Sequence, residues 1–152
     1  MQPELATLLP APAELLPHRP PMLQIDAIES FTPGEGLVAV KEIGEDNPFL
    51  EGHFPGYPLM PGVMLIEMMF QACGLYGRLQ EHYEKGGQPN GEKKMGRAIK
   101  INEAVFKGEV RPPAKLEIKV DFKQKIFSFS TFSGSIKCGG KVVAEAVLTV
   151  FI

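Results

Sequence analysis

The chain has 152 residues, of which 44% are hydrophobic and 22% are charged, and its formal net charge at pH 7 is −2. This length and composition exclude an intrinsically disordered protein and predict one folded domain over residues 1–152. The small negative charge provides no overall attraction for nucleic acid, so we expect no nucleic-acid partner.

The cysteines and the N-terminal segment indicate in which cellular compartment the protein is expected. Cys73 and Cys138 do not form the spaced framework that disulfide scaffolds and cysteine metal sites require. Arg19 is the first basic residue, and several prolines precede it, which does not resemble a secretory signal. The longest strongly apolar stretch, residues 63–66, is far shorter than the roughly 20 residues that span a bilayer. We therefore expect a cytoplasmic protein with no membrane association and no bound metal.

Prolines and glycines divide the first sixty residues into short elements. Residues 13–16 can form at most one helical turn. Residues 22–28 and 37–43 are short strand candidates on either side of a turn-prone Thr-Pro-Gly sequence, and they predict an opening hairpin. Residues 47–62 are rich in Pro, Gly and apolar side chains, a composition that predicts a packed loop without regular structure.

A helix is expected directly after this loop. Proline disappears and good helix formers dominate over residues 63–79, with Pro61 placed near the first turn. Apolar side chains between Val63 and Phe70 point in all directions around the helix axis. The pattern predicts a helix that is enclosed by protein on all sides.

The second half of the chain favours strands. After a glycine-rich connection at residues 85–95, apolar and polar residues alternate over residues 116–122 and 142–150, as half-buried strands require. Residues 98–106 and 127–136 supply two further strands, and Gly139-Gly140 suits a hairpin turn before the last strand. One buried helix followed by antiparallel strands predicts an α+β domain in which a sheet wraps the helix.

Glu67 is the most informative single residue for function. We expect it to be the one buried ionisable side chain of the helix, and carboxylates are rarely buried without a reason. Burial disfavours the charged form, so Glu67 would hold a proton that it can donate. Gln71 lies one helical turn further on and can hydrogen-bond the carboxyl group. A structural polar pair, or a glutamate that emerges at a subunit seam, would have the same pattern.

His53 and Gly62 are further candidates. An imidazole suits proton abstraction near neutral pH, and the glycines around His53 allow a ligand to approach the backbone closely. Gly62, at the start of the expected helix, would present an N–H that can hold a carbonyl oxygen as it gains negative charge. An ordinary hydrogen-bonded loop histidine and a simple helix-start glycine are the alternatives. We assign no chemistry to His18 and His82.

These features become specific in combination. Gly52-His53-Phe54-Pro55-Gly56 is followed by Leu59-Met60-Pro61-Gly62-Val63, and Glu67 comes 14 residues after His53. This arrangement closely resembles the FabZ and FabA families of 3-hydroxyacyl-[acyl-carrier-protein] dehydratases. Residues 16–22 and 106–110 also resemble these families, so the similarity covers most of residues 14–150.

The resemblance implies a hot-dog fold, in which the sheet wraps a long central helix. It also implies a homodimer or a trimer of dimers, with His53 of one copy facing Glu67 of another across a subunit interface. His53 would remove the C2 proton of an acyl chain carried on acyl carrier protein, and Glu67 would protonate the departing 3-hydroxyl group. The reaction would need no metal and no organic cofactor.

The same resemblance assigns supporting roles. The carbonyl group of Leu59 would orient the His53 ring, the Gly62 N–H would bind the thioester carbonyl, and Phe54 and Gln71 would contact the substrate. A glutamate at position 67 is similar to FabZ, whereas residues 95–99 and 106–115 are more similar to FabA. The additional double-bond isomerisation associated with FabA, and membership of a polyketide or polyene branch, therefore remain open.

Two other functions share this fold. A hot-dog thioesterase would direct water onto the thioester carbon, and a non-catalytic subunit would bind the acyl carrier without turnover. The presence of both His53 and Glu67 favours the dehydratase. For the acidic carrier protein we expect a basic docking patch. Its candidates are Lys93, Lys94, Arg97, Lys100, Lys107 and Arg111.

Overall fold

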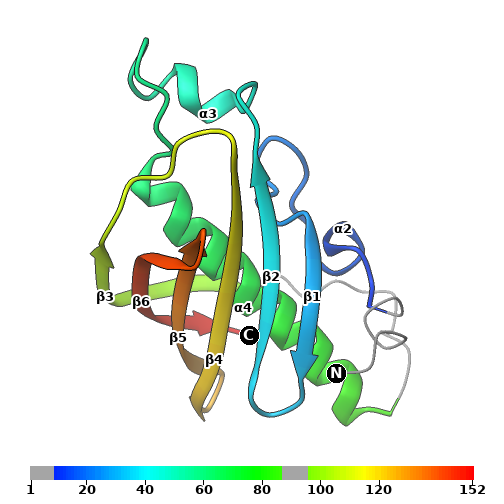
Figure 1. Cartoon of the computed structure of the whole chain (residues 1–152). Coiled ribbons are helices and arrows are strands. Elements are labelled where there is room, and N and C mark those ends of the chain that lie inside the picture. The colour runs from blue at the N-terminus through cyan, green and yellow to red at the C-terminus, as the bar shows by residue number, and fades with distance from the viewer. Residues whose placement is uncertain (1–8, 87–95) are drawn as a thin grey trace.

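A long helix packed across an antiparallel sheet organises the chain (Figure 1). The computed structural model describes residues 9–86 and 96–152. In chain order the elements are α2 (Pro12–Leu15), β1 (Ala27–Thr32), β2 (Gly36–Ile43), α3 (Pro48–Glu51), α4 (Gly62–Glu84), β3 (Arg97–Phe106), β4 (Ala114–Ile126), β5 (Phe129–Cys138) and β6 (Lys141–Phe151). Within these ranges no helix is both long and apolar enough to cross a bilayer.

The sheet has six strands in the order β1-β2-β4-β5-β6-β3, and every neighbouring pair is antiparallel. Figure 1 shows α4 running diagonally behind the sheet, from α3 at one end to the turn between β1 and β2 at the other. The strands β1 and β3 form the two edges. The predicted α+β arrangement, with a sheet around one central helix, is confirmed.

The core lies between α4 and the sheet. Met69 and Ala72 of the helix and Ile118 and Phe132 of the sheet have no exposed surface. A Cβ atom at Gly134 of β5 would lie 2.8 Å from the sulfur of Met69, so glycine at this position allows the helix to approach the sheet closely. The helix is therefore fixed against the sheet by side-chain packing.

The strand predictions are largely confirmed, but two strands begin later than predicted: the strand placed at residues 127–136 is β5, which begins at Phe129. The alternating segments form β4 and β6, and Gly139 and Gly140 both adopt positive φ in the turn between β5 and β6. The first strand was placed at residues 22–28, but β1 begins at Ala27. The reason is that the backbone of Met22 and Gln24 bonds to the side chain of Gln71 instead of to a neighbouring strand.

Three other expectations need correction. The helix α4 is not enclosed on all sides, because Val63 is 72% exposed in the single chain. Glu67 is not the one buried ionisable side chain of this helix, because it is 25% exposed whereas Arg78 is only 7% exposed. The loop at residues 47–62 contains the short helix α3, whose start is capped by the Asn47 side chain accepting from the Phe49 N–H. The predicted connection at residues 85–95 falls largely outside the described residues.

Candidate active site in two halves

His53 lies in the connection from α3 to α4 and is held by the backbone around it. Its Nδ1 atom is 2.8 Å from the carbonyl oxygen of Leu59, as expected. A carbonyl oxygen can only accept, so the hydrogen bond places the proton of the neutral ring on Nδ1 and leaves the lone pair of Nε2 free. The ring of Phe54 stacks on the imidazole at a centroid distance of 4.0 Å. We call His53, Phe54 and Leu59 the base half.

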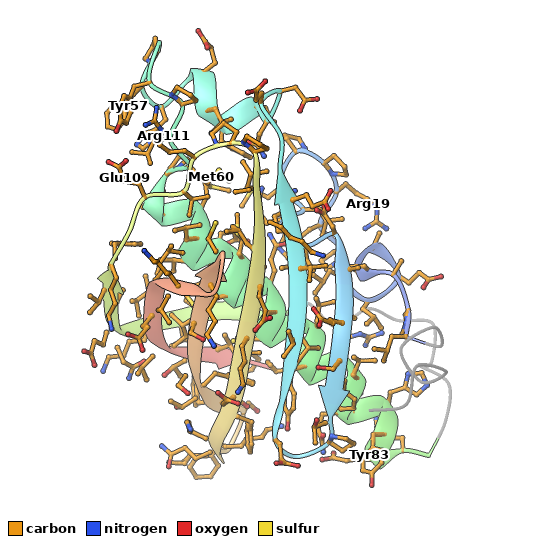
Figure 2. All side chains as sticks on the ribbon, in the orientation of Figure 1. Arg19, Tyr57, Met60, Tyr83, Glu109 and Arg111 are labelled. Atoms are coloured by element: carbon orange, nitrogen blue, oxygen red, sulfur yellow. The ribbon has the colours of Figure 1, made fainter. Side chains whose placement is uncertain are left out.

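The loop that carries the base half is anchored to the connection between β3 and β4. The Met60 N–H donates to the carbonyl of Val110 at 2.9 Å, and the Tyr57 hydroxyl donates to Glu109 at 3.0 Å. The guanidinium of Arg111 lies over the Tyr57 ring at 4.3 Å. Figure 2 shows Tyr57, Met60, Glu109 and Arg111 together at one end of the molecule. These contacts limit how far His53 can move.

Gly62 is the first residue of the 23-residue helix α4. The N–H groups of a first helical turn have no intrahelical partners, and the helix dipole is positive at this end. A Cβ atom at Gly62 would lie 2.8 Å from the Phe106 ring of β3, so the close approach of that ring requires glycine. The local structure thus suits the predicted role of Gly62 as a donor.

Glu67 lies in the second turn of α4, and its side chain is 25% exposed. Gln71 Nε2 donates to Glu67 Oε2 at 2.8 Å, which confirms the hydrogen bond expected from the i, i+4 spacing. Gln71 also donates to the carbonyl of Met22 and accepts from the Gln24 N–H, both at 2.8 Å. Gln71 is 2% exposed, so it is a buried clamp that joins the N-terminal segment to the carboxyl group.

The structure brings His18 to this carboxyl group. His18 Nε2 lies 3.7 Å from Glu67 Oε2. Sequence reasoning gave His18 no role, because a contact across so long a stretch of chain leaves no local pattern. The only available signal was its place in the proline-rich segment that resembles the dehydratase families. We call His18, Glu67 and Gln71 the acid half.

A pocket of about 130 Å³ opens beside the acid half. All three residues of the acid half line it, together with apolar side chains that include Phe70, Val150 and Ile152. None of the residues of the base half lines this pocket, and neither does Gly62. One chain therefore presents a base half and a separate acid half, which is what an active site shared between two copies requires.

In the ranges described, no three His, Cys, Asp or Glu side chains lie close enough together to hold a metal ion. The described residues of the predicted carrier patch are spread along β3 and the connection that follows it. Arg97 and Phe106 mark opposite ends of β3, about 30 Å apart in an extended strand. Lys107 pairs with Glu145, and Arg111 stacks on Tyr57. Lys93 and Lys94 lie outside the described residues.

The fold and the site together define the class of protein. The fold is a hot-dog domain, an antiparallel sheet wrapped on a central helix, with His53 before the start of that helix and Glu67 in its second turn. The model of the FabA-like domain family matches residues 16–147, and the chain belongs to that family.

Similar sequences narrow the comparison from the family to one kind of enzyme. The chain is 39% identical over 137 residues to the 3-hydroxyacyl-[acyl-carrier-protein] dehydratase FabZ of Zymomonas mobilis, a match that covers 90% of this chain and 83% of the relative. It is 38% identical over 135 residues to the FabZ dehydratase of Neisseria meningitidis, covering 89% of this chain and 87% of the relative.

Solved structures confirm the fold. The dehydratase heterocomplex ApeI:P from Xenorhabdus doucetiae matches with a TM-score of 0.77 at 21% identity, covering 94% of this chain and 91% of that one. A hypothetical thioesterase with coenzyme A from Streptococcus pneumoniae matches with a TM-score of 0.61 at 16% identity, covering 82% of each chain. At these identities the matches establish the hot-dog fold alone.

Proposed function

We propose that this protein dehydrates (3R)-hydroxyacyl-[acyl-carrier-protein] to trans-2-enoyl-[acyl-carrier-protein] in fatty acid synthesis. The observation that carries the proposal is the hydrogen bond between His53 Nδ1 and the Leu59 carbonyl oxygen. Because a carbonyl oxygen can only accept, Nδ1 is the donor in this bond, and Nε2 of the neutral ring is the atom that can take a proton from a substrate. Membership of the FabA-like family and similarity to FabZ dehydratases support the same reaction.

In this mechanism His53 Nε2 takes the C2 proton of the substrate. The electron pair of the C2–H bond forms the C2=C3 double bond, and the C3–O bond breaks with its electrons going to oxygen. Glu67 gives its proton to that oxygen, which leaves as water. The N–H of Gly62 stabilises the negative charge that develops on the thioester oxygen. Return of the proton from His53 to Glu67 completes the cycle.

A second copy of the chain is proposed to complete the site. Every residue of the edge strand β3 is exposed, and its apolar side chains include Ile101 and Phe106, each 51% exposed. A long apolar edge strand is a template for pairing with another chain. Arg97 and Ala98 of β3 also line the pocket of the acid half. A partner on β3 would therefore lie against that pocket and bring its own base half to it.

The wider proposals follow from this reaction. The substrate arrives on acyl carrier protein, and Arg111 is the predicted patch residue that lies beside the loop of the base half.

Residues 1–152 are proposed to act as one dehydratase domain. The cytoplasm is the proposed compartment, since Cys73 and Cys138 are both free thiols and burial raises the pKa of Cys73.

The direct test follows enoyl formation from 3-hydroxyacyl-[acyl-carrier-protein]. His53→Ala and Glu67→Gln should each lower kcat by about 10²–10⁴-fold, the usual contribution of a positioned acid or base. His82→Ala, in the last turn of α4, is the matched control and should leave kcat unchanged. Free acid in place of enoyl thioester would favour a thioesterase instead, and a 3-enoyl product would reveal isomerisation.

A further inference from the structure

The contacts of Glu67 fall on one of its two carboxyl oxygens. Gln71 Nε2 donates to Oε2 at 2.8 Å, and His18 Nε2 faces the same oxygen at 3.7 Å. Within the described part of the chain, Oε1 has no hydrogen bond. Donors on one oxygen favour negative charge there, so the proton of the acid form belongs on the other oxygen. The carboxyl group is thus oriented with Oε1 as its reactive atom.

Hydrogen bonds hold the backbone on both sides of His18. The Arg19 side chain donates to the carbonyls of Leu16 at 2.9 Å and His18 at 2.7 Å, which folds the backbone around the imidazole. Gln71 fixes the same segment further on through Met22. His18 Nδ1 is buried without a hydrogen-bond partner in the described residues. A neutral ring with its proton on Nε2 fits this setting, because that tautomer aims its donor at Glu67.

Two arginines, Arg78 of α4 and Arg97 of β3, line the same pocket as this carboxyl group. The backbone of Arg78 lies three turns further along the helix, about 16 Å along its axis, and its side chain pairs with Glu81. The guanidinium of Arg97 lies over the Phe151 ring at 4.9 Å. His18 is therefore the titratable group next to Glu67 in the described residues.

We propose that His18 is a positioning residue for the catalytic acid: together with Gln71 it holds Oε2 of Glu67 and turns the proton on Oε1 toward the pocket. At 3.7 Å the His18 contact is longer than a direct hydrogen bond, so it acts through the local field of its N–H group. The inference rests on the proposed function, because it assumes that Glu67 donates a proton.

The first experiment compares His18→Ala, His18→Leu and His18→Gln with the native protein, using 3-hydroxyacyl-[acyl-carrier-protein] as substrate. Loss of the donor should lower kcat about tenfold in the Ala and Leu variants and leave KM within about twofold, because the interaction acts on proton transfer rather than on binding. His18→Gln keeps an amide donor and should recover most of the rate. Thermal unfolding of each variant establishes that it is folded, and His18→Leu retains side-chain bulk if the alanine variant does not fold.

The second experiment combines His18→Ala with Glu67→Gln in a double-mutant cycle. A residue that acts through Glu67 has nothing to orient once the acid is gone, so the double variant should be as active as Glu67→Gln alone. An equal tenfold loss in both backgrounds, or a native rate in folded His18→Ala, would overturn the positioning role. A native rate in Glu67→Gln would instead overturn the proposed function itself, so the two failures are distinct.

Discussion

The imidazole of His53 and the carboxyl group of Glu67 each make one direct hydrogen bond within the described residues. The Leu59 carbonyl fixes the tautomer of His53, and the Gln71 amide holds one oxygen of Glu67. Gln71 in turn satisfies two backbone groups of the N-terminal segment. The buried side-chain amide of Gln71 therefore both orients the Glu67 carboxyl group and stabilises the fold.

Gln71→Leu tests this dual role. The substitution keeps similar bulk but leaves the Gln24 N–H and the Met22 carbonyl without their buried partner. We expect the free energy of unfolding to fall by about 1–3 kcal/mol, the usual result of stranding a buried polar group. We also expect kcat to fall more than KM changes, since Glu67 loses its orientation. Urea unfolding and steady-state kinetics measure the two effects, and a stable, fully active variant would contradict the clamp.

The sequence predicts the central helix and most strands because their signals are local. Proline before a run of good helix formers marks the start of α4, and period-two alternation marks β4 and β6. The start of β1 could not be placed this way, since the Gln71 side chain replaces a strand as the partner of residues 22–24. The approach of His18 to Glu67 was missed for the same reason, because it depends on packing between distant segments.

Among the strands, β3 has an exposed surface that no other element of the described chain covers. Every residue of β3 is exposed, although it lies beside β6 in a six-stranded sheet. Its side chains reach from the pocket of the acid half to Gly62, which contacts the Phe106 ring. A second copy on this strand would cover apolar surface and adjoin both regions.

Ile101→Lys, at the middle of β3, should therefore weaken self-association and lower activity together. A charge in a buried apolar interface is costly, so we expect a shift toward monomer in sedimentation velocity runs and a parallel loss of enoyl formation. The matched control is Ile126→Lys at the end of β4, because Ile126 is 55% exposed and Ile101 is 51% exposed. Equal behaviour of the two variants would count against pairing through β3.

Within one chain, the base half and the acid half do not line the same pocket. The base half lies on the connection between α3 and α4, and the acid half joins two residues of α4 to His18 of the N-terminal segment. Only the acid half lines the pocket with Phe70 and Val150. A dimer related by two-fold symmetry would place each base half against the partner's acid half and create two equal sites.

Mixing of two inactive variants tests whether the active site is shared between two copies of the chain. His53→Ala and Glu67→Gln chains are unfolded, mixed in equal amounts and refolded, and enoyl formation is measured. Half of the resulting dimers are mixed and each has one intact site, so a shared site should give about a quarter of the native rate from two inactive parents. Native chains mixed with the double variant His53→Ala/Glu67→Gln form mixed dimers without an intact site. No recovery in the first mixture, or active mixed dimers in the second, would show that each chain works alone and would contradict the shared site.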